Sequence, residues 1–157
     1  MEDPSIKLAR ELHRVVIRLV YFQDDDEYSH VDKFQEVTSW IYNTCRQLIQ
    51  FKGTTVEEEA EICLSLLEGY SATIRDEINI KEAMSRSYKI LPDMEPSVMK
   101  CSLLVHCYGE AGDKALADEA KQIMDAWSGR ELTEEEKHIK QLLADMEENE
   151  IISNREQ

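Results

Sequence analysis

The sequence predicts an all-α protein, and three observations support this fold class. Its 157 residues include only 5 Gly and 3 Pro, and so few helix breakers favour helices over a β-sandwich or barrel. Apolar residues recur every three or four positions, which is the period of an amphipathic helix. Capping residues and glycines separate about seven such segments. Because the connections are short, we expect antiparallel neighbours, either as stacked tetratricopeptide-like helical hairpins or as a compact helical bundle.

The first predicted helix covers about residues 4–21, with Asp3 as its N-cap and Pro4 at the first helical position. We expect the acid run at residues 24–26 to end it. Its apolar stripe contains Leu8, Leu12, Val15 and Leu19. A second stripe is basic and contains Lys7, Arg10, Arg14 and Arg18. These basic side chains either pair with acidic residues of the fold or form a docking face.

The second predicted helix covers about residues 31–51 and ends before Gly53, since glycine readily adopts the left-handed cap conformation. Its apolar stripe contains Phe34, Val37, Ile41, Cys45 and Leu48. A third helix begins after Thr54 and Thr55, either of which can form a capping box with the Glu three residues on. Its apolar seam contains Val56, Ala60, Cys63, Leu67, Tyr70 and Ile74.

The fourth predicted helix covers residues 80–91, with Asn79 as its cap. Proline residues at 92 and 96 then interrupt the chain. The fifth helix covers about residues 97–111 and is apolar on nearly all sides. A helix with so narrow a polar strip is expected at the centre of the fold.

Two more helices complete the predicted fold. Gly112 and Asp113 turn the chain into the sixth, which residues 128–130 end. Its apolar residues are Leu116, Ala117, Ala120, Ile123, Met124 and Trp127. Thr133 caps the seventh in a capping box with Glu136. Its buried stripe contains Ile139, Leu142, Leu143 and Met146. We predict a single helical domain over residues 1–149 and a frayed C-terminal tail over residues 150–157.

The charge balance limits the classes of partner. There are 33 acidic and 18 basic residues, which gives a formal net charge of −15. Such a surface repels phosphate groups, so we expect neither direct nucleic-acid binding nor binding to an anionic membrane. It would attract a basic protein partner. The acidity is also consistent with a simple role in solubility.

The cysteines and the hydropathy pattern indicate an intracellular protein. Cys45, Cys63, Cys101 and Cys107 fall beside apolar residues within predicted helices. They form no C-x-x-C pair or Cys/His cluster, so zinc binding and dithiol chemistry have no support. We interpret them as buried reduced thiols. No apolar run of signal-peptide or membrane-spanning length occurs, and we expect a cytoplasmic location.

No motif for catalysis, a cofactor or a metal is present. Ser102, His106 and Glu110 share one face of the fifth helix, in the order of a nucleophile, a base and an acid. A catalytic triad also needs oxyanion donors in a cleft, which the sequence does not indicate, so we favour an ordinary polar strip. The acid runs at residues 24–27 and 134–136 lack the alternating ligands of a calcium loop. We therefore predict no enzymatic activity and no cofactor.

Three blocks of sequence carry a family resemblance. They are GTTVEEEA (residues 53–60) continuing with CLSLLEGYSATI (63–74), then KCSLLVHCYGE (100–110), and finally AKQIMDAWSGRELTEE (120–135). In this order and spacing they resemble the UpxZ family of transcription antitermination antagonists. The resemblance is strongest over residues 53–143, and the first 50 residues match less closely.

The resemblance implies a regulator encoded in the capsular polysaccharide loci of gut anaerobes. In that family each locus encodes a NusG-like antiterminator, UpxY, which lets RNA polymerase read through the leader of its own operon. The UpxZ protein inhibits antiterminators of other loci and so represses their operons, without any catalytic motif. The alternative is a generic helical-repeat adaptor unrelated to transcription. The sequence leaves the oligomeric state open, a homo-oligomer included.

We predict a partner-binding surface at helix ends and turns, where packing alone does not explain the residues present. The candidates are Tyr108, Glu110, Ser128, Arg130 and Glu131. Three aromatic rings, Tyr70, Tyr108 and Trp127, are of the type that anchors interfaces. Each also continues an apolar stripe, so we favour core packing for them.

Overall fold

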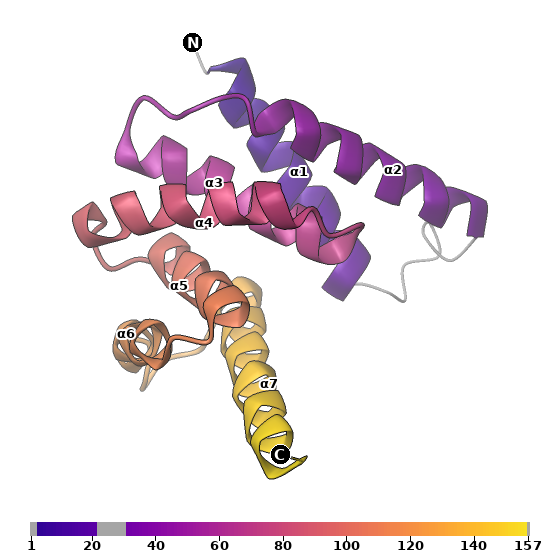
Figure 1. The fold of residues 1–157 in the computed structure, drawn as a ribbon. Helices are drawn as coiled ribbons and strands as arrows, with labels where there is room; N and C mark the ends of the chain where they lie inside the picture. Colours follow the sequence, from indigo (N-terminus) through magenta and orange to yellow (C-terminus); the bar gives the residue numbers. More distant parts are fainter. Residues whose placement is uncertain (1–2, 22–30, 157) are drawn as a thin grey trace. The chain divides into compact units, whose positions relative to one another are not determined.

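The computed structural model describes residues 3–21 and 31–156, and within them it contains seven α-helices, one 3₁₀-helix and no strand (Figure 1). The elements are α1 (Pro4–Tyr21), α2 (Val31–Leu48), α3 (Val56–Ala72), α4 (Glu77–Ile90), η2 (Leu91–Asp93), α5 (Val98–Ala111), α6 (Lys114–Asp125) and α7 (Glu134–Glu156). The predicted all-α fold class is confirmed. The acid run predicted to end the first helix lies outside the described residues.

The chain forms two compact units, Met1–Met94 and Glu95–Gln157. The sequence predicts one helical domain over residues 1–149 and a C-terminal tail from residue 150. Helix α7 continues through that tail to Glu156. The first unit contains α1 to α4 with η2, and the second contains α5 to α7.

Helix α3 is the centre of the first unit, because α1, α2 and α4 all pack against it (Figure 1). Every residue from 62 to 70 is buried. Two polar side chains in this stretch find partners on α1. The Ser65 hydroxyl donates to the Ala9 carbonyl at 2.8 Å, and the Glu68 carboxylate lies 2.7 Å from His13 Nδ1. Polar residues can therefore be buried in α3, because groups of α1 form hydrogen bonds with them.

The buried face of α1 differs from the predicted stripe. It contains Ile6, Ala9, Leu12, Val16 and Leu19, whereas Leu8 and Val15 are only partly buried. The small Ala9 lies against α3, where its carbonyl accepts the Ser65 bond. This close approach rotates the helix relative to the stripe of larger side chains. On the basic stripe, Arg10 pairs with Glu61 of α3 at 3.2 Å, so part of that stripe stabilises the fold.

The α1, α2 and α3 helices approach one another closely at Gly69. A Cβ atom built there would lie 2.4 Å from the Cys45 Sγ of α2 and 3.7 Å from the Leu12 Cδ1 of α1. Cys45, Leu12 and Gly69 are all buried. Close packing therefore requires glycine at position 69, because a protein interior has no room for an extra methyl group.

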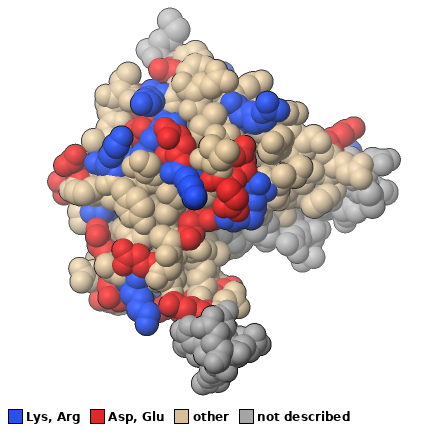
Figure 2. All heavy atoms as spheres, viewed as in Figure 1, with Lys and Arg blue, Asp and Glu red and all other residues tan. Residues whose placement is uncertain are grey.

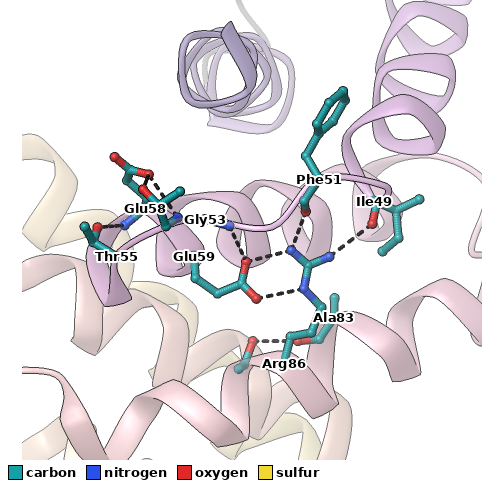
Figure 3. Close-up of polar contacts among 10 residues, drawn as sticks. Ile49, Phe51, Gly53, Thr55, Glu58, Glu59, Ala83 and Arg86 are labelled. Carbon is teal, nitrogen blue, oxygen red and sulfur yellow. Dashed lines mark hydrogen bonds and ion pairs between the residues drawn. The ribbon is translucent and has the colours of Figure 1, made fainter. Parts of the chain in front are cut away.

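Arg86 of α4 connects three segments of the first unit (Figure 3). Its side chain is 4% exposed. The guanidinium donates to both carboxylate oxygens of Glu59, at 2.9 and 2.7 Å, and to the carbonyls of Ile49 and Phe51, at 3.1 and 2.6 Å. Glu59 also accepts the Gly53 N–H at 3.0 Å. Burial alone would raise the pKa of Glu59, but these donors hold it below its ordinary value.

Helix α2 is shorter than predicted, and this network lies just beyond its end. The periodic pattern continued to residue 51, yet α2 ends at Leu48. The carbonyls of Ile49 and Phe51 leave the helix and accept bonds from Arg86. After the turn, Thr55 caps α3 by accepting the Glu58 N–H, as predicted. The reciprocal bond differs, because Glu58 accepts from the N–H and hydroxyl of Thr54.

Three other details of the first unit correct the sequence prediction. Helix α4 begins one turn early, with Asp76 rather than Asn79 as its N-cap. The Asn79 amide instead donates to the hydroxyl of the buried Tyr70 at 3.0 Å. Phe34 and Ile74 were predicted in apolar stripes but are 48% and 69% exposed. Ile74 lies beyond the last residue of α3, and Phe34 lies in the first turn of α2.

Helix α5 is the centre of the second unit, and α6 and α7 pack against it. Residues 100–105, 107 and 108 are buried, in agreement with the nearly apolar sequence. Ser97 caps α5 by accepting the Lys100 N–H. Gly112 ends it in the left-handed conformation with φ 70°, and Asp113 then caps α6. The predicted turn between the fifth and sixth helices is thus confirmed.

We expect Arg86→Met to destabilise the protein by about 3–5 kcal/mol, because it leaves the Glu59 carboxylate without its cation in a largely buried site. Arg75→Met is the matched control, since it removes an exposed arginine paired with Glu77 at 2.9 Å, and it should leave the free energy of unfolding nearly unchanged. Urea unfolding followed by circular dichroism measures both. Equal losses in the two variants would contradict the proposed importance of the network.

We expect Gly69→Ala to cost about 1–3 kcal/mol through overpacking, although alanine favours a helix. Gly109→Ala should cost less, because its Cβ would meet only the flexible end of the Met146 side chain. Adding Cys45→Ala to Gly69→Ala removes the obstructing sulfur, so the double variant should lose less than the two single losses together. Additive losses would show that Gly69 and Cys45 are not coupled.

Candidate partner-binding surface

The two units differ in their charge density. The second, shorter unit contains 15 acidic and 7 basic residues, a formal charge of −8 over Glu95–Gln157. On the face drawn in Figure 2, acidic and basic side chains lie interspersed rather than in one large patch. A partner attracted by the overall charge must therefore be selected by local features of the surface.

A hollow of about 780 Å³ lies in the second unit, at the beginning of α5 and along α6. We name it the α5–α6 hollow. Its lining residues are Pro96, Ser97, Lys100, Ala115, Asp118, Glu119, Gln122, Ile123, Ala126 and Trp127. Trp127 and Ile123 are mostly buried and supply an apolar floor, whereas Asp118 and Gln122 are exposed. An apolar floor beside polar groups is typical of a binding pocket.

The one cation of this hollow is neutralised within the fold. Lys100 is 8% exposed, and its ammonium lies 2.8 Å from the Glu119 carboxylate. The side chain of Glu119 remains 46% exposed, and Asp118 is exposed. The hollow therefore presents net negative charge to a partner.

A second, smaller hollow of about 410 Å³ lies at the turn between α6 and α7. We name it the α6–α7 hollow. Its lining residues are Lys121, Met124, Asp125, Trp127, Ser128, Gly129, Arg130, Leu132 and Lys140. Three of them are basic, but Lys121 pairs with Glu147 at 2.6 Å and Arg130 pairs with Glu136 at 2.6 Å. Much of its positive charge is thus already balanced.

The Arg130–Glu136 pair holds the beginning of α7. The guanidinium donates to both carboxylate oxygens of Glu136, at 2.8 and 2.6 Å. Glu136 also accepts the Thr133 N–H, and Thr133 accepts the Glu136 N–H, which is the predicted capping box. The Arg130 bond and the Thr133 N–H together lower the pKa of Glu136 from 4.5 to about 2.

The predicted partner-binding residues fall into two separate groups. Tyr108 and Glu110 lie at the end of α5, and Ser128, Arg130 and Glu131 follow the end of α6. Because α6 leads from the first group to the second, its 12 residues separate them by about 18 Å. Ser128 and Arg130 line the α6–α7 hollow. Glu131 is exposed beside it.

Tyr108 occupies a buried position. It is 4% exposed, and its hydroxyl donates to the Glu150 carboxylate of α7. That bond and burial raise the pKa of Tyr108 to about 12. The preference for core packing of Tyr70, Tyr108 and Trp127 agrees with their exposed fractions of 0, 4 and 7%. Trp127 nevertheless lines both hollows.

The α5–α6 hollow was missed by the sequence prediction. Ile123 and Trp127 were placed in an apolar stripe, and nothing in their spacing showed that Pro96 and Lys100 would lie near them. One signal was present: Lys100 is the basic residue of an otherwise apolar helix, and such a residue requires a partner from another element. Glu119, on the next helix, is that partner.

Ser102 and the four cysteines, the nucleophilic residues considered in the sequence, all lie in the interior. Ser102 is buried, at 5% exposure, and lines neither hollow. The four cysteines are buried with free thiols, and burial raises the pKa of Cys45, Cys63 and Cys101 to about 12. The described residues contain no metal-binding group of His, Cys, Asp and Glu. Among them, no helix is both long enough and apolar enough to cross a membrane.

Comparison with protein families identifies the group to which this fold belongs. The model of the UpxZ family of transcription anti-terminator antagonists matches residues 9–109, which is more than half of the chain. The protein belongs to the UpxZ family. The matched region begins in α1, so the first helix is included, although the sequence resemblance had been placed mainly over residues 53–143.

A solved structure of the UpxZ family supports the same assignment. The chain is similar to a transcription anti-terminator antagonist UpxZ from Bacteroides uniformis, known from a crystal structure, with 32% sequence identity and a TM-score of 0.83. The similarity covers 94% of this chain and 95% of that chain. It therefore extends well past residue 109. No curated protein matches the chain.

The lowered pKa of Glu136 gives a testable pH dependence. Because its pKa in the folded protein is below 4.5, ionised Glu136 stabilises the fold above about pH 4.5, and this contribution is lost as the pH falls towards 2. Glu136→Gln should therefore lower the melting temperature at pH 7, and the difference from wild type should vanish near pH 2. Glu148→Gln, an exposed position on the same helix, serves as control. A difference that persists unchanged at pH 2 would contradict this assignment.

Proposed function

We propose that the protein binds NusG-like antiterminators of the UpxY type that belong to other loci, and inhibits them. By doing so it would repress the capsular polysaccharide operons that those antiterminators serve. The observation that carries this proposal is membership of a family of transcription anti-terminator antagonists, through the match over residues 9–109 and the similarity to a solved UpxZ structure over 94% of the chain.

The physical properties of the chain are those of a binding protein. We propose that it acts in the cytoplasm by contact alone, without catalysis or a cofactor. The net charge of −15 favours fast encounter with a basic protein surface. It opposes binding to the phosphates of the leader DNA or RNA. Inhibition would then come from covering a surface that the antiterminator needs, rather than from competition for nucleic acid.

A leader-readthrough reporter tests this function. A panel of antiterminators, each on its own leader, is measured with and without the protein. We expect readthrough to fall for antiterminators of other loci and to stay unchanged for the antiterminator of the same locus. Purified complexes with the inhibited antiterminators should weaken as salt rises, because exposed charges are screened.

Unchanged readthrough across the whole panel would defeat the proposed function and would favour the alternative of a helical adaptor unrelated to transcription. The matched control is Arg86→Met, which is expected to lower stability without altering either hollow. Its inhibition per folded molecule should therefore equal that of the wild type at a temperature where both are folded.

A further inference from the structure

We propose that the α5–α6 hollow is where the antiterminator docks, and that it receives a basic segment carrying one large apolar side chain. This inference rests on the proposed function and specifies the surface and the chemistry of the partner. Three features of the hollow carry it: its apolar floor, its acidic rim and the small side chains that leave it open.

The floor fits an apolar anchor. Trp127 and Ile123 are only 7% and 9% exposed, so they are held rigidly by the unit and lose little freedom when a partner binds. A volume of about 780 Å³ is ample for a large side chain with part of its backbone. Anchors of this kind, seated in rigid pockets, supply most of the affinity of typical interfaces.

Small residues keep the floor accessible. Ala115 and Ala126 are exposed residues of the lining, near the two ends of α6. Ala126 has φ −68° and ψ −14°, a conformation that any larger residue could adopt. The backbone therefore does not require alanine there, and the opening of the hollow depends on its small size.

The rim selects for positive charge. Asp118 is exposed, and the half-exposed Glu119 already neutralises the buried Lys100. The hollow belongs to the unit with a formal charge of −8. A neutral or acidic segment would bring no opposite charge to the exposed Asp118, whereas Lys or Arg beside the anchor would pair with its carboxylate. This charge distinguishes the α5–α6 hollow from the α6–α7 hollow, whose lining contains three basic residues and one acidic residue.

Two substitutions test the site in the full-length protein, with the most strongly inhibited antiterminator of the reporter panel as the purified partner. Ala126→Phe fills the hollow, and Ala144→Phe places the same side chain at an exposed position of α7. Asp118→Lys reverses the rim charge, and Glu148→Lys makes the same charge change at an exposed position of α7. All four are compared with wild type by titration calorimetry and by melting temperature.

We expect Ala126→Phe and Asp118→Lys each to weaken binding at least about tenfold, and the two controls to change it less than about twofold. The Asp118→Lys effect should shrink at high salt, whereas that of Ala126→Phe should not. A photo-crosslinker at position 126 should attach to an antiterminator peptide in which Lys or Arg flanks a large apolar residue.

Binding that survives both Ala126→Phe and Asp118→Lys would overturn this docking site while leaving the proposed function intact. A loss of binding in Ile78→Ser, with binding retained in the two hollow variants, would also overturn it. Ile78 of the first unit is 80% exposed and is the strongest rival anchor. A crosslinked peptide of acidic character would overturn the charge argument. If the wild type bound and inhibited no antiterminator at all, the proposed function would fail together with the docking site.

Discussion

Arg86 carries a positive charge into the interior of the first unit, where four hydrogen-bond acceptors make its burial tolerable. Two are the oxygens of Glu59 in the first turn of α3, and two are the carbonyls of Ile49 and Phe51, just beyond the end of α2. One side chain of α4 thus joins the segment after α2 to the first turn of α3. At Gly69, α1 and α2 pack so closely on α3 that the three helices can slide very little past one another.

The sequence was a good guide where structure is decided locally. Caps such as Thr55 and Thr133 act on residues three positions away, so their spacing predicts the helix starts. Prediction from the sequence failed where residues far apart in the chain decide which side chain acts as a cap or a partner. Asp76 and Asn79 are both suitable caps, and the hydroxyl of Tyr70 settles the choice by engaging Asn79. The partners of Arg86 lie 27 to 37 residues away, beyond the reach of any periodicity.

The same difference between local and long-range interactions explains which of the predicted partner-binding residues line a hollow. Helix ends were chosen because packing does not account for their residues, and Ser128 and Arg130 do line a hollow. Tyr108 looks similar in sequence but is covered by α7, whose Glu150 accepts its hydroxyl. The α5–α6 hollow brings together residues of two helices, among them Lys100 and Glu119, which pair across it. In the sequence, the apolar floor is part of a helical stripe, whereas the acidic rim corresponds only to the overall excess of acidic residues.

The net charge of the chain overstates how strongly its acidic residues attract a basic partner. Glu59, Glu68 and Glu136 are largely buried and face Arg86, His13 and Arg130, so they contribute little to the field felt by a partner. Long-range attraction also treats every basic protein alike, whereas the proposed function, inhibition of the antiterminators of other loci, requires discrimination between related partners. Discrimination of that kind requires local shape and charge together. On the described surface, the α5–α6 hollow combines an apolar floor with exposed carboxylates. We therefore propose that this hollow determines specificity, and that the remaining negative charge raises the rate of encounter with a basic partner.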